Sequence, residues 1–132
     1  MTSQLKALVV DDAELSRIML ANSLNGVFSY EEAENGLLAV QKYQDAVKNG
    51  VPYDIVFMDI IMPEMDGKAA LQKIREYEEL NGLPRTPIYM VSASEMLDGV
   101  EGLPEGLLRK PASRQLLNEI CMKHFPGKVS SI

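Results

Sequence analysis

The feature that most constrains the fold of this chain is an alternation between short apolar runs and segments with helical hydrophobic spacing. Residues 5–10, 54–59 and 87–92 form largely continuous apolar runs, and each run ends at or just before an aspartate or a serine. Because apolar and polar residues do not alternate within them, these runs predict strands that are covered on both faces. Weaker strand patterns occur at 27–33 and 107–109.

Segments with helical spacing follow four of the five predicted strands. They span about 15–24, 38–49, 70–80 and 113–125. Asp66 and Ser113 stand where N-caps are expected, and the glycines at 26, 50 and 82 suit helix ends. A regular succession of strand and helix predicts an α/β domain, with a five-stranded parallel sheet that has helices on both faces.

Length and composition narrow the class of protein. The chain has 132 residues, so we expect one domain over 1–132, with a core at 5–125 and a tail at 126–132. Its 13 basic and 19 acidic residues give a net charge of −6, so direct binding to nucleic acid is not expected. No apolar run is long enough for a signal peptide or a membrane span, and the single cysteine, Cys121, cannot form an internal disulfide. We therefore expect a cytoplasmic protein without a membrane partner.

Polar side chains stand at the carboxyl ends of the predicted strands. These residues are Asp11, Asp12, Asp59, Ser92 and Lys110. Parallel strands bring their carboxyl ends to one edge, where ligands of such sheets bind. Three neighbouring carboxylates repel one another unless a cation neutralises them, and a set of oxygen ligands favours Mg²⁺. The sequence thus predicts a site where one carboxylate accepts a phosphoryl group, with the lysine and the hydroxyl as its other contacts.

These residues occur within four motifs that resemble those of receiver domains of two-component response regulators. The motifs are at 9–12 (Val-Val-Asp-Asp), 57–67 (Phe-Met-Asp-Ile-Ile-Met-Pro-Glu-Met-Asp-Gly), 87–93 (Pro-Ile-Tyr-Met-Val-Ser-Ala) and 109–111 (Arg-Lys-Pro). The resemblance covers about residues 5–125, and the order and spacing of the motifs are specific to the family. It implies a doubly wound, flavodoxin-like (βα)5 fold.

The resemblance also implies a role for each site residue. Asp59 aligns with the phosphoacceptor, Asp12 with an acid that binds Mg²⁺ or Mn²⁺ directly, and Asp11 with an acid that acts through water. The backbone carbonyl of Ile61 aligns with a further ligand of the ion, and no organic cofactor is implied.

Two further residues align with the contacts of the phosphoryl group in this family. Ser92 corresponds to the switch hydroxyl and Lys110 to the lysine that pairs with the phosphoryl group. A receiver domain takes its phosphoryl group from a histidine kinase or a histidine phosphotransfer protein, catalyses only its own phosphorylation and dephosphorylation, and changes its affinity for a downstream protein partner. We expect a monomer or a weak homodimer.

Two departures from the family pattern leave alternatives open. Leu107 stands where the family usually has an aromatic residue that moves on activation. The connection between Ser92 and Lys110 is short and rich in glycine and proline, which predicts a shortened or irregular fourth helix. A receiver-like module that signals without phosphorylation therefore stays open. An aspartate-nucleophile phosphohydrolase is less favoured, because it needs an aspartate where Ile61 stands, and a flavodoxin-like cofactor binder would need a phosphate loop in place of Asp11 and Asp12.

The remaining polar residues are interpreted as structural. The acidic run of Glu76, Glu78 and Glu79 is expected on a solvated helix face. His124 falls in the last turn of the final helix, where a cation suits the helix dipole. Cys121 is expected to be buried rather than reactive.

Overall fold

The computed structural model describes residues 5–24, 28–60, 62, 65–92, 102–109 and 114–125. Five strands form one sheet: β1 (Leu5–Val10), β2 (Phe28–Ala33), β3 (Ile55–Asp59), β4 (Ile88–Ser92) and β5 (Gly106–Arg109). Four helices occur in the described residues: α1 (Glu14–Leu24), α2 (Gly36–Lys48), α3 (Gly67–Leu80) and α4 (Arg114–His124). The predicted α/β alternation is confirmed, and the weak strand pattern at 27–33 is a full edge strand.

All neighbouring strands pair in parallel, in the order β2-β1-β3-β4-β5. This is the strand order of flavodoxin-like folds, in which the direction of winding reverses beside β1. Ligands of such sheets bind at the carboxyl ends of the strands where the reversal occurs, here β1 and β3. The topology alone therefore indicates where a functional site should lie.

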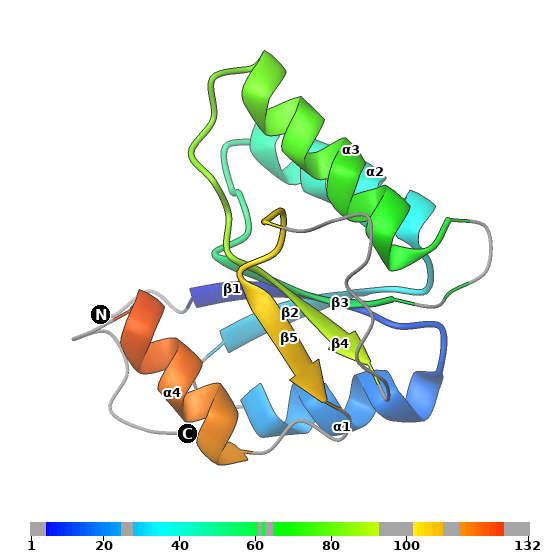
Figure 1. Cartoon of the computed structure of the whole chain (residues 1–132), viewed down its shortest axis with the longest axis vertical. Helices are drawn as coiled ribbons and strands as arrows, with labels where there is room; N and C mark the ends of the chain where they lie inside the picture. The colour runs from blue at the N-terminus through cyan, green and yellow to red at the C-terminus, as the bar shows by residue number, and fades with distance from the viewer. Residues whose placement is uncertain are drawn as a thin grey trace.

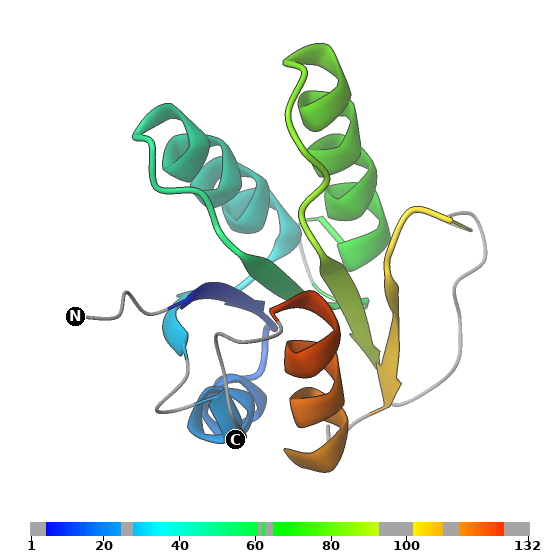
Figure 2. The same cartoon turned by 90° about the vertical axis from the view of Figure 1, so that its left-hand side faces the viewer.

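The helices cover the two faces of the sheet in pairs. Helices α2 and α3 pack on one face, and α1 and α4 lie on the other (Figure 1, Figure 2). Because side chains alternate along each strand, the sheet supplies two separate apolar clusters, one below each helix pair. Leu8, Val56 and Met90 belong to the cluster under α2 and α3, whereas Val9 and Phe57 face α1 and α4.

The ends of α2 and α3 follow the chemistry expected from the sequence, whereas the predicted N-cap Ser113 and the predicted helix end at Gly26 lie outside the described residues. The Asp66 side chain accepts a hydrogen bond from the Ala69 N–H at 2.9 Å, which confirms it as the N-cap of α3. Asn35 caps α2 in the same way through the Leu38 N–H. After these helices, Gly50 and Gly82 adopt φ of 76° and 61°, a conformation that glycine tolerates best.

Residues 102–105, which lead into β5, are irregular. The expected position of a shortened helix falls at 93–101, outside the described residues, and residues 102–105 form a turn and bends that lead into β5. Leu107 is partly buried and packs with Leu103 against the cluster beneath α2 and α3. The predicted tail at 126–132 also lies outside the described residues.

Candidate phosphorylation and metal site

Three carboxylates meet at the carboxyl ends of β1 and β3. Asp11 and Asp12 directly follow β1, and Asp59 is the last residue of β3. Each offers a carboxylate oxygen, and these oxygens all lie within 4.8 Å of one another. Asp11 and Asp59 are buried while Asp12 is exposed, so the cluster opens to solvent on one side.

Asp11 is held by its backbone as well as by its side chain. Its N–H donates to the Ala33 carbonyl of β2 at 3.1 Å, and its Oδ1 accepts from the Ala13 N–H at 2.9 Å. Its carbonyl accepts from Arg17 Nη1 at 2.7 Å, while Arg17 Nε pairs with Glu32 at 3.0 Å. Helix α1 begins three residues after Asp11, so this carboxylate shapes the turn before the helix and is not its N-cap.

Asp59 is held where its strand turns toward α3. Its Oδ1 accepts from the Ile60 N–H at 3.0 Å, and the Gly67 N–H donates to the Ile60 carbonyl at 2.7 Å. A Cβ on Gly67 would lie 1.9 Å from the Asp59 carbonyl oxygen, so only glycine fits against this strand end. The sequence predicted Asp66 as an N-cap, but the close approach of Gly67 to Asp59 was not evident from it.

Ser92 is buried at the end of β4, the strand beside β3. Strand pairing places Asp59 opposite Val91, so Ser92 lies one residue further along the same edge. On its other side Ser92 pairs with Arg109, the last residue of β5. Two predicted site residues, Ile61 and Lys110, lie outside the described residues, each next in sequence to a described one, Ile60 or Arg109.

The donor set of the cluster fits a hard divalent cation. Three carboxylates this close repel one another, and a cation between them relieves the repulsion. Oxygen donors alone suit Mg²⁺ or Mn²⁺ rather than a metal that prefers nitrogen or sulfur. This is the one group of three potential metal ligands within the described ranges. A buried carboxylate, a cation site and a buried hydroxyl on the next strand are the parts that phosphoryl transfer to an aspartate needs.

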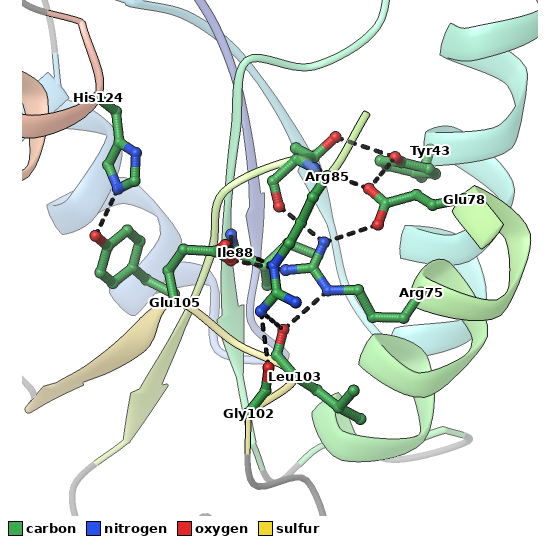
Figure 3. Close-up of polar contacts among 11 residues, drawn as sticks. Tyr43, Arg75, Glu78, Arg85, Ile88, Gly102, Leu103, Glu105 and His124 are labelled. Atoms are coloured by element: carbon green, nitrogen blue, oxygen red, sulfur yellow. Dashed lines mark hydrogen bonds and ion pairs between the residues drawn. The ribbon is translucent and has the colours of Figure 1, made fainter. Parts of the chain in front are cut away.

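Another charged group lies at the opposite ends of the strands, between α3 and the start of β4 (Figure 3). Arg75 Nη1 donates to Glu78 Oε1 at 2.8 Å and to the Thr86 carbonyl at 2.9 Å. Glu78 Oε2 accepts from the Tyr43 hydroxyl at 2.6 Å and from the Thr86 N–H at 2.9 Å. The expectation that Glu78 is solvated is therefore wrong. Its side chain is only 6% exposed, because it faces α2 and β4, while Glu76 and Glu79 are exposed as expected.

The same group continues onto the segment that leads into β5. Arg75 Nη2 and Arg85 Nε donate to the two oxygens of Glu105, at 2.7 and 3.1 Å. Arg75, Glu78, Arg85 and Glu105 are hereafter called the arginine–glutamate network. It contains two positive and two negative charges.

The hydroxyl of Tyr43, which bonds Glu78, remains protonated. Burial and the neighbouring Glu78 carboxylate raise the pKa of Tyr43, so its hydroxyl stays a donor.

The last helix carries the other two residues interpreted as structural. Cys121 is buried, and burial raises its pKa to about 11, so it is not a reactive thiolate. His124 Nε2 lies 2.7 Å from the Tyr89 hydroxyl of β4. This contact agrees with the structural interpretation of His124, and burial and the neighbouring Lys123 lower its pKa, which disfavours the expected role as a cation.

Comparisons with known proteins agree with this geometry. A profile of the response regulator receiver domain matches residues 7–121. The chemotaxis protein CheY of Bacillus subtilis is 37% identical over 112 residues, which are 80% of this chain and 85% of that protein. The two-component response regulator ORR41 of Oryza sativa is 35% identical over 126 residues, 90% and 93% of the two chains.

A solved structure of a CheY protein has the same fold as this chain. It is the complex of CheX and CheY with BeF3 and Mg²⁺ from Borrelia burgdorferi, with a TM-score of 0.76 and 28% identity over 92% of this chain and 89% of that one. Within the described part of this chain, no helix is long and apolar enough to cross a membrane.

Proposed function

Since the chain belongs to the family of response regulator receiver domains, we propose that it accepts a phosphoryl group on Asp59 and thereby switches its binding to a protein partner. The observation that carries this proposal is the meeting of Asp11, Asp12 and Asp59 within 4.8 Å at the reversal point of the sheet. As a receiver domain, the chain is a signalling module of two-component and phosphorelay systems.

The transfer requires a nucleophile and a stabilised phosphoryl group. A carboxylate oxygen of Asp59 forms a bond to phosphorus as the phosphorus–nitrogen bond of a phosphohistidine breaks, and the imidazole leaves with the bonding electron pair. The Ser92 hydroxyl donates to one phosphoryl oxygen and the Lys110 ammonium pairs with another. In this way the chain catalyses its own phosphorylation, and it turns over no free metabolite.

The cation site belongs to the same proposal. Asp11, Asp12, Asp59 and the backbone carbonyl of Ile61 would hold Mg²⁺ or Mn²⁺, and Asp11 would act through water. When bound, the ion neutralises the carboxylates and the charge on the phosphoryl oxygens. The oxygen-only donor set supports this assignment, as does the Mg²⁺ in the related complex from Borrelia burgdorferi.

The partners follow from the chemistry of the switch. The phosphoryl donor is a histidine kinase or a histidine phosphotransfer protein, and the phosphorylated chain acts on a downstream protein in the cytoplasm as a monomer or weak homodimer.

One observation favours an alternative, a receiver that signals without phosphorylation. Leu107 is partly buried with Leu103, so no aromatic side chain is available to move at that position.

The test is intact-mass spectrometry after incubation with phosphoramidate, with Mg²⁺ and with excess chelator. We expect the mass of one phosphoryl group to be gained only with Mg²⁺, and Asp59→Asn to abolish the gain. Asp54→Asn is the matched control, because Asp54 precedes the same strand at its other end and bonds the Lys6 N–H. Failure of the wild type to gain mass with Mg²⁺ would support signalling without phosphorylation instead.

A further inference from the structure

Strand β5 is weakly fixed by its own pairing. It has four residues, lies at the edge of the sheet and pairs only with β4. A four-residue strand with one neighbour has few ladder hydrogen bonds to hold its register, and a slip by one residue turns every side chain to the opposite face. Such a slip would also move the strand by about 3.3 Å along β4. The end of β5 therefore needs a further contact to stay beside Ser92.

Glu105 supplies this contact directly before the strand. Its backbone N–H donates to the Ile88 carbonyl at 2.8 Å, and its side-chain Oε1 accepts from the Ile88 N–H at 3.0 Å. Glu105 is thus bonded to both polar groups of Ile88, the first residue of β4. The pairing that follows sets Gly106 opposite Tyr89 and ends with Arg109 opposite Ser92.

Arg75 holds the Glu105 carboxylate in this position (Figure 3). Its side chain is 9% exposed, and its guanidinium donates to Glu105 Oε1 at 2.7 Å and to the Leu103 carbonyl at 2.9 Å. Because Arg75 also bonds the Thr86 carbonyl just before β4, one side chain from α3 is bonded to the segments that lead into both strands. Arg85, which is half exposed, adds bonds to the Gly102 and Leu103 carbonyls at 2.8 Å.

We propose that Glu105, oriented by Arg75, is a positioning residue for phosphorylation: its two bonds to Ile88 fix the β4–β5 register that brings the end of β5 beside Ser92. This rests on the proposed function, since Lys110 follows Arg109 directly in sequence and is the proposed phosphoryl contact. Glu105 lies at the far end of the strand and acts on the reaction only through this register.

The proposal separates metal binding from phosphoryl transfer. The three carboxylates lie at the carboxyl ends of β1 and β3, whereas Glu105 bonds Arg75, Arg85 and Ile88, so Glu105→Ala should leave the Mg²⁺ affinity unchanged in calorimetric titration. The phosphorylation rate with phosphoramidate at saturating Mg²⁺ should fall roughly ten- to a hundredfold, because small displacements of a positioned group cost this much. Glu105→Gln keeps an acceptor for Ile88 and should restore most of the rate.

Glu78→Gln is the matched control, because Glu78 belongs to the same network but contacts α2, α3 and the Thr86 N–H rather than β5. We expect it to lower stability while the phosphorylation rate stays within about twofold of the wild type. Equal slowing by Glu78→Gln and Glu105→Ala would show a general loss of stability and overturn the proposal. Should Glu105→Ala fail to fold, Glu105→Asp, which cannot reach both Ile88 and Arg75, should show the same separation on a smaller scale.

Amide hydrogen exchange of β5 tests the register without phosphorylation. Glu105→Ala should make the β5 amides exchange faster than in Glu78→Gln when both are compared at equal global stability. Unchanged exchange in β5 would overturn the proposal even if the phosphorylation rate fell. A wild type that is not phosphorylated would instead refute the proposed function, and the exchange result would still decide whether Glu105 fixes the register.

Discussion

The two ends of the sheet hold clusters of charged side chains of opposite character. At the carboxyl ends of β1 and β3, three carboxylates gather within 4.8 Å. At the other end, the arginine–glutamate network pairs two arginines with two glutamates at 2.7 to 3.1 Å. Three like charges meet at one end, whereas each arginine at the other end pairs with a glutamate.

This difference separates a site for binding from a site for stability. A matched, hydrogen-bonded set of charges gains nothing from a ligand, and removing one member leaves its partner buried and unpaired. A group of like charges lowers the stability of the empty domain and gains from any cation that joins it. Mutations at the two ends should therefore change stability in opposite directions.

The largest effect is expected in the network. Glu78→Ala removes the acceptor of Arg75, Tyr43 and the Thr86 N–H, so we expect a loss of about 3–5 kcal/mol in the free energy of unfolding. Urea unfolding measures it. Glu79→Ala, an exposed neighbour on α3, should change stability by less than about 0.5 kcal/mol. Similar values for both variants would show that the Glu78 contacts contribute little.

The next largest effect is expected at Gly67, the first residue of α3, which packs against Asp59. Gly67→Ala places a Cβ against the Asp59 carbonyl, where backbone and not a flexible side chain must move. We expect a loss of about 2–3 kcal/mol and slower phosphorylation of Asp59. Lys73→Ala, on an exposed position of the same helix, is the control. Thermal unfolding and the mass assay measure the two effects, and an unaffected phosphorylation rate would show that this contact does not position Asp59.

At the acidic end, we expect a mutation to raise the free energy of unfolding of the metal-free domain rather than to lower it. Asp59→Asn removes one of three repelling charges, so the domain without metal should gain about 1 kcal/mol. With Mg²⁺ at a hundred times its dissociation constant, the wild type should gain about 2.7 kcal/mol, and the variant much less. Thermal melts with Mg²⁺ and with chelator give both values. A variant that is less stable without metal would contradict the electrostatic comparison.

The sequence was sufficient for the fold because its signals were local. Continuous apolar runs predicted the central strands β1, β3 and β4, and Asp66 capped α3 as expected. Strand β2 was only a weak pattern because it is an edge strand whose four middle residues are exposed or polar. Its pairing with β1, which no local signal encodes, determines its conformation.

The sequence predicted that Asp11, Asp12 and Asp59 lie close together, because the carboxyl ends of parallel strands meet at one edge. It was less informative about side chains whose position depends on contacts between distant segments. It placed Glu78 in solvent because a run of three glutamates contains no sign of the arginine and tyrosine that fold around one of them. The steric need for Gly67 against Asp59 is a contact between two elements and was equally hidden.

The smallest expected effect is the influence of Glu105, a member of the arginine–glutamate network, on the pKa of His124. The chain has one histidine, so the ring signals of His124 can be followed by NMR without ambiguity. Burial and Lys123 lower its pKa from 6.5, while Glu105 opposes them, so Glu105→Gln should lower the pKa further. Because the unfolded chain takes up this proton first as pH falls, the contribution of His124 to stability is complete above pH 6.5 and is lost on acidification below it. A pKa above 6.5 would show that burial and Lys123 do not dominate, and a pKa that Glu105→Gln raises or leaves unchanged would show that the network does not act on His124 in this way.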